Sequence, residues 1–182
     1  QEYTKWFSKH TNGSHPMLDP FPRVIIVQGL GMWTAGKDKN ASSITQDIYH
    51  HTIDIINNAD SIDNYRSLSD LEAYDAEYWP LELYKRSLAT PEKELSRRIV
   101  LVTGAASGIG KAITRRFLKE GAHIVATDVD YKKLKILNKE LCDSYGSDKI
   151  LALKMDVTDE SEVLSVFEKI KLTFGGLDIL VS

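Results

Sequence analysis

The sequence is poor in several features that would place it in a specialised class. Its 182 residues include one cysteine, Cys142, which excludes an internal disulfide. No apolar run approaches the ~18 residues of a membrane-spanning helix. The formal net charge of −3 gives no electrostatic case for nucleic acid. We therefore expect a cytoplasmic globular protein with no nucleic-acid or membrane partner, and a buried, inert thiol at Cys142.

What is present is the composition of a folded protein, with 42% hydrophobic and 27% charged residues. Acidic residues are in excess before about residue 96, and basic residues are in slight excess after it. This shift favours a domain boundary there. We predict one domain over 1–90, a linker over 91–97 and a second domain over 98–182. Because the chain starts without Met and stops within a predicted strand, we expect it to be a piece of a longer protein.

The second half of the chain alternates between strand and helix patterns with short connections. Short apolar runs predict strands at 98–103, 123–127, 150–155 and 177–181. Helical periodicity predicts helices at 108–120, 131–144 and 159–174, with Ile109, Ala112, Ile113 and Phe117 on one face of the first. Right-handed crossovers would place the strands in a parallel sheet covered on both faces. The fold class is therefore α/β, a partial Rossmann-type doubly wound parallel sheet of four strands.

A glycine-rich turn joins the first of these strands to the first helix, over Thr103–Gly110. A strand that ends in such a turn and leads into a helix is typical of a site for a dinucleotide pyrophosphate. We expect Gly104 to permit the tight turn, Gly108 to let a phosphate approach the backbone, and Gly110 to permit close packing of the helix.

Asp128 ends the second predicted strand, 18 residues after Gly110. In a Rossmann domain this carboxylate accepts hydrogen bonds from an adenine-ribose hydroxyl. The alternative is that Asp128 only caps the helix near Tyr131. A carboxylate here repels a 2′-phosphate, so we predict NAD as cofactor; Lys132 and Lys133 keep NADP possible as the second choice.

These residues resemble the short-chain dehydrogenase/reductases, which space the turn as T-G-x-x-x-G-x-G. Asp156-Val157 is similar to the family's Asp-Val pair beside the adenine, and Gly175–Val181 resembles its lead into the fourth strand. The resemblance covers 98–182. The candidate cofactor-binding residues are Thr103, Gly104, Ser107, Gly108, Ile109, Gly110, Asp128, Val129, Asp156 and Val157.

The resemblance assigns no catalytic residue within this chain. The family's catalytic Ser and its Tyr-x-x-x-Lys pair lie beyond Ser182. Two such spacings occur, Tyr131/Lys135 and Tyr145/Lys149, but both lie near the adenine side of the expected fold. We expect neither to be catalytic, and the 182 residues alone to be inactive.

The first half of the chain is less regular: a strand is expected at 23–28, a helix at 41–57 and a helical segment at 72–88 around Pro80. The segments 17–31 and 77–82 resemble proteins that fuse a class II sugar-phosphate aldolase, of the rhamnulose-1-phosphate type, to a short-chain dehydrogenase. We expect 1–90 to be a small α/β tail of that aldolase. Leu30 stands where such aldolases place a metal-binding histidine, and His50-His51 point to different sides of a helix. No metal site is predicted.

The predicted function follows from the fusion that the chain resembles. The parent protein would oxidise a small, lactaldehyde-like substrate with hydride transfer to NAD. Two alternatives are a dinucleotide-binding module without chemistry, and metal-dependent aldol cleavage of a ketose 1-phosphate. The partners are then a nicotinamide dinucleotide and a small-molecule substrate. An exposed edge at the fourth strand predicts a homo-oligomer.

Overall fold

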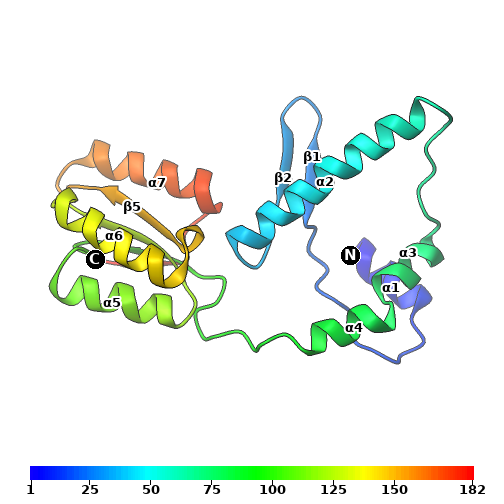
Figure 1. The fold of residues 1–182 in the computed structure, drawn as a ribbon, viewed down its shortest axis with the longest axis horizontal. Helices are drawn as coiled ribbons and strands as arrows, with labels where there is room; N and C mark the ends of the chain where they lie inside the picture. The colour runs from blue at the N-terminus through cyan, green and yellow to red at the C-terminus, as the bar shows by residue number, and fades with distance from the viewer. The chain divides into compact units, whose positions relative to one another are not determined.

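A computed structural model describes all 182 residues, which form two compact units. The first comprises 1–35 and 44–91, and the second comprises 36–43 and 92–182 (Figure 1). No helix in the chain has the length and apolar character needed to span a bilayer.

The first unit contains helices and one small β-hairpin. The hairpin pairs β1 (Val24–Val27) with β2 (Gly31–Thr34) in antiparallel register. The helices are α1 (Glu2–His10), α3 (Asp70–Glu77), α4 (Pro80–Ser87) and most of α2 (Lys39–Asp60). The sequence patterns predicted β1 and α2 but not α1 or β2. The expected single helical segment around Pro80 is two helices, because proline begins α4 at its first turn.

An aromatic cluster forms the core of this unit in place of aliphatic side chains. Tyr74 on α3 and Tyr78, immediately after that helix, are buried and stack with ring centroids 4.8 Å apart. The Tyr78 hydroxyl accepts a hydrogen bond from the backbone of Leu18 and lies 2.7 Å from the hydroxyl of Tyr3 on α1. These bonds satisfy polar groups that burial would otherwise leave unpaired. The aromatic cluster therefore ties α1 and the loop after it to α3.

The second unit is built on a four-stranded parallel sheet in the order β5-β4-β3-β6. Its strands are β3 (Ile99–Val102), β4 (His123–Asp128), β5 (Ile150–Lys154) and β6 (Ile179–Val181). Its helices are α5 (Gly108–Lys119), α6 (Tyr131–Tyr145) and α7 (Glu160–Phe174), and η1 (Ser147–Lys149) is one 3₁₀ turn. This topology confirms the predicted partial Rossmann-type fold.

Alternating side chains of the strands divide the interior of this sheet into two cores. Val100 and Val102 face a cluster that contains the α6 residues Leu134, Leu137 and Leu141. Leu101, between them in sequence, faces the opposite cluster with α7. This alternation follows from the two-residue period of a strand. Helices α5 and α6 accordingly cover one face and α7 covers the other (Figure 1).

Residues 92–97, which were expected in the linker, are hydrogen-bonded to the second unit. The Leu95 N–H donates to the carbonyl of Glu120, and the Lys93 ammonium donates to the carbonyl of Lys119. Both carbonyls belong to the end of α5, where helical carbonyls have no partner within the helix. The Leu95 side chain also packs against the core. This segment therefore caps α5.

His123 at the start of β4 is buried, with 4% of its surface exposed, and neither ring nitrogen has a hydrogen-bond partner. Its ring contacts the Phe174 ring edge-on at 5.7 Å. Burial lowers the pKa of the ring, and the Lys149 charge adds to this effect. In the unfolded chain the His123 ring would bind a proton near pH 6.5, whereas in the folded chain it stays neutral at that pH.

We expect the stability of this unit to fall as the pH drops from about 6.5 towards the folded pKa of His123. His123→Phe should abolish that fall and, by removing unpaired buried nitrogens, raise stability at about pH 7.5 by roughly 1 kcal/mol. Hydrogen exchange of the β4 amides at about pH 7.5 and 5 measures both effects. His50→Gln, at an exposed histidine of α2, should keep the wild-type pH dependence. Equal acid sensitivity of His123→Phe and wild type would contradict the assignment.

Candidate cofactor site

The glycine turn leaves β3 at Thr103 and enters α5 at Gly108. Gly104 and Gly108 have φ of +62° and +51°, a left-handed conformation that glycine adopts without strain. No atom lies within 4 Å of the place where a Cβ on either residue would stand. The turn therefore has the shape expected for close approach of an anion to the backbone, with the amino end of α5 beside it.

Gly110 is required for a different reason. A Cβ on Gly110 would stand 2.8 Å from the Gly104 carbonyl carbon and closer still to its oxygen. We expected this glycine to allow packing of the helix on the sheet. The close neighbour is instead the backbone of the turn itself, so Gly110 lets α5 begin directly against Gly104.

Asp128, at the carboxyl end of β4, holds two backbone segments with its carboxylate. Oδ2 accepts from the Ala106 N–H at 3.0 Å, and Oδ1 accepts from the Asp130 N–H at 2.9 Å. The alternative interpretation of Asp128 as the cap of α6 is wrong, because Asp130 is that cap and accepts from the Lys133 N–H. Each Asp128 oxygen keeps further acceptor capacity for a ligand hydroxyl.

Three apolar side chains are exposed beside the carboxyl ends of the strands. Ile109, Val129 and Val157 are 80%, 58% and 61% exposed, and they follow β3, β4 and β5 in the chain. Of the residues expected on one face of α5, Ile113 and Phe117 pack against the core, whereas Ile109 in the first turn is exposed. Carboxyl ends of parallel strands meet at one edge of a sheet, so the three exposed side chains provide apolar surface there.

The predicted Asp156-Val157 pair follows β5. The Asp156 carboxylate accepts from the N–H and the hydroxyl of Thr158, which lowers its pKa. The Asp156 N–H donates to Glu162, whose other carboxylate oxygen is 2.8 Å from the Lys154 ammonium. The loop after β5 is thus fixed by hydrogen bonds to the first turn of α7.

Sequence reasoning missed the partners that position these groups. Ala106, Asp130 and Glu162 all hold parts of the site through hydrogen bonds, but Ala106 occupies a variable position of the turn motif and the other two lie outside it. Ala106 acts through its backbone N–H, so its side-chain type carries no signal. Asp130 could have been found as a helix cap, since Asp is preferred there.

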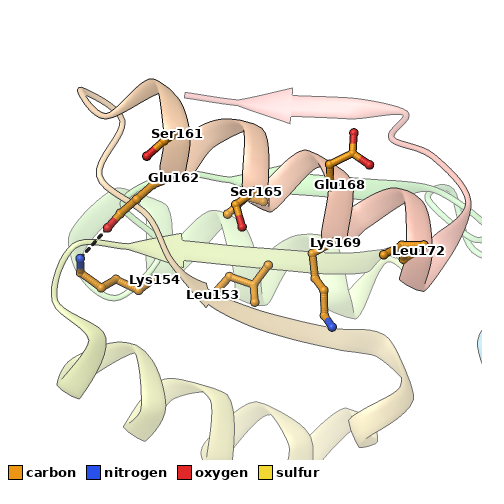
Figure 2. Close-up of a pocket in the computed structure, with 9 residues that line it drawn as sticks. Leu153, Lys154, Ser161, Glu162, Ser165, Glu168, Lys169 and Leu172 are labelled. Carbon is orange, nitrogen blue, oxygen red and sulfur yellow. Dashed lines mark hydrogen bonds and ion pairs between the residues drawn. The ribbon is translucent and has the colours of Figure 1, made fainter.

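Other residues considered from sequence lie elsewhere. The Lys135 ammonium stands over the Tyr131 ring, 4.7 Å from its centroid, in the first turns of α6. Burial raises the pKa of the Cys142 thiol, as expected for an unreactive cysteine. No three His, Cys, Asp or Glu side chains gather as a metal-binding group. A groove of about 620 Å³ runs along α7 and β5 (Figure 2), but none of the predicted cofactor residues lines it.

The chain matches two protein families. Residues 1–85 match the second domain of aldolase class II, and residues 98–182 match short chain dehydrogenase. An uncharacterized oxidoreductase, YuxG of Bacillus subtilis, is 40% identical over the whole chain. The chain covers 26% of that relative's length.

Two further matches each cover about half of this chain. The 3beta-hydroxysteroid dehydrogenase 2 of Eggerthella lenta is 40% identical over 88 residues, 48% of this chain and 33% of the relative. Among solved structures, the L-sorbose reductase of Gluconobacter frateurii, complexed with NADPH and L-sorbose, is 36% identical. That match covers 50% of this chain and 34% of the reductase, with a TM-score of 0.46.

Proposed function

We propose that the chain contributes the NAD half-site of an oxidoreductase, because residues 98–182 match short chain dehydrogenase and residues 1–85 match the second domain of aldolase class II. The observation that carries the proposal is Asp128 bonded to the glycine turn at the carboxyl edge of the sheet. The residues proposed to bind the dinucleotide are Thr103, Gly104, Ser107, Gly108, Ile109, Gly110, Asp128, Val129, Asp156 and Val157.

The roles of these residues follow from their chemistry. The amides of the turn and of α5 would meet the pyrophosphate, because a helix amino end carries unpaired N–H groups and a positive dipole. Asp128 would accept the ribose hydroxyls through its remaining lone pairs. Ile109, Val129 and Val157 would lie along apolar parts of the ligand. When bound, the nicotinamide ring supplies hydride transfer.

The proposed substrate is a class of compound and not one named molecule. We propose that the whole protein oxidises a small, lactaldehyde-like hydroxy or aldehyde compound, with catalytic residues outside this chain. The 182 residues alone should therefore bind nucleotide without turnover. Metal-dependent aldol cleavage would require ligands that these residues do not gather.

Calorimetric titration with NAD and NADP tests the proposed site. We expect wild type to prefer NAD, and Asp128→Ala to weaken NAD binding tenfold or more, because a hydrogen bond to a charged group is lost. NADP binding should weaken less, since the repulsion of its 2′-phosphate is lost at the same time. Asp128→Asn should retain an acceptor for Ala106 and so separate loss of charge from loosening of the turn.

Asp143→Ala is the matched control, because Asp143 is an exposed aspartate of α6 outside the site. It should bind both cofactors as wild type does. Binding of neither dinucleotide to wild type would contradict the proposed function. A non-catalytic dinucleotide module remains the second candidate; it predicts the same titrations but no hydride transfer by the whole protein.

A further inference from the structure

The turn between β4 and α6 carries a second carboxylate close in sequence to Asp128. Asp130 caps α6 with Oδ1, which accepts from the Lys133 N–H at 3.1 Å. Its other oxygen, Oδ2, forms an ion pair with the Lys133 ammonium at 2.9 Å. Asp130 therefore binds both the backbone N–H and the side-chain ammonium of Lys133.

Two lysines in this turn could meet an anion at the ribose edge, and they differ in their partners. Lys133 is bound to Asp130, and its pKa is raised chiefly by that contact, with a further contribution from Asp128. Lys133 lies in the first turn of α6, directly after the strand that ends at Asp128. Lys132 is exposed and forms no ion pair. Of the two lysines, Lys133 is therefore the one that is already paired with a carboxylate.

NAD and NADP differ at this edge by a phosphate on the adenine-ribose 2′ oxygen. A site with Asp128 accepts a 2′-hydroxyl and repels a phosphate, unless a nearby cation offsets the repulsion. Asp130 opposes NADP in two ways: it adds a second negative charge, and it occupies the ammonium that could offset the first.

We propose that Asp130 is a specificity-determining residue, which keeps this site selective for NAD by holding Lys133 away from a 2′-phosphate. The inference rests on the proposed cofactor site, and it adds a residue that the glycine-turn motif does not contain. Asp128 sets the preference by direct contact with the ribose. Asp130 sets it indirectly, through the lysine.

The test is titration of Asp130→Ser with NAD and NADP, alone and combined with Asp128→Ala. Serine is chosen because its hydroxyl also caps a helix, so α6 keeps its first turn. We expect NADP to bind about tenfold more tightly in Asp130→Ser than in its parent, the effect of one charge-assisted hydrogen bond to the freed lysine. NAD binding should change less than about twofold, because its ribose has no phosphate to contact.

Two lysine variants show whether the gain passes through the named side chain. Adding Lys133→Ala to Asp130→Ser should remove most of the gain in NADP affinity, leaving only the part that comes from the lost Asp130 charge, and adding Lys132→Ala should leave the gain in place. Added salt should reduce the gain, since the contact is between exposed charges. The helical circular dichroism of each variant verifies that α6 is formed.

The inference is overturned if Asp130→Ser leaves the NAD/NADP ratio unchanged, or if the gain survives Lys133→Ala undiminished. Either result, with NAD still bound by wild type, leaves the proposed cofactor site intact. Failure of wild type to bind either dinucleotide would instead overturn the proposed function itself.

Discussion

Gly110→Ala is expected to be the most damaging single substitution in the second unit. The added methyl would stand 2.8 Å from the carbonyl carbon of Gly104 and 3.2 Å from Cα of Ala105, both backbone atoms of the turn. Neither can rotate away, so the start of α5 or the turn must move. We expect a loss of about 3 kcal/mol or more, with loss of NAD binding.

Gly176→Ala is the matched control for this substitution. Gly176 follows α7, has no atom within 4 Å of its would-be Cβ, and does not adopt a left-handed conformation. Its replacement should change stability by less than about 0.5 kcal/mol. Urea unfolding, monitored by hydrogen exchange of the β3 and β4 amides, compares the stability of the two variants. Similar stabilities for both would show that the turn accommodates a methyl group and that this account of Gly110 is wrong.

Ile170→Ala is expected to have the second largest effect. Ile170 is 1% exposed and belongs to the core that α7 forms with Leu101 and Val125 of the sheet. Removal of three buried carbons leaves a cavity between helix and sheet, and such changes cost about 2–5 kcal/mol. The β6 strand follows α7, so its amides should lose protection from exchange as well.

Leu172→Ala provides the control on the same helix. Leu172 is 83% exposed and lies at the groove beside β5 (Figure 2). Its truncation should alter stability by less than about 0.5 kcal/mol. Tryptophan fluorescence monitors the first unit in the same variants. Trp6, Trp33 and Trp79 all lie in that unit, and none reports directly on α7. An equal loss of stability in both variants would contradict the observed packing of α7.

The elements of the second unit could be predicted because each is encoded locally. Apolar runs of four to six residues, helical periodicity and terminal glycines are properties of adjacent residues, and β3 to β6 and α5 to α7 lie where those signals predict them. In the first unit such signals predicted β1 and α2 but not β2 or α1. The hairpin partner β2 contains Gly31 and a Trp, and α1 contributes Tyr3 and Trp6 to an aromatic cluster whose other members come from distant segments. The core of the first unit depends on contacts between residues far apart in the chain, which no local pattern predicts.

The parallel Rossmann-type sheet, the glycine turn and the acidic residue at the end of β4 could be predicted, because spacing along the chain fixes all three. The groups that position this acidic residue are visible only in the folded protein, where Asp128 is bonded to Ala106 and Asp130 is paired with Lys133. The tertiary structure also turns Ile109 outward and buries His123 without a hydrogen-bond partner. These features depend on the direction of side chains and on contacts between separate loops. Such contacts form only when the strands are brought side by side.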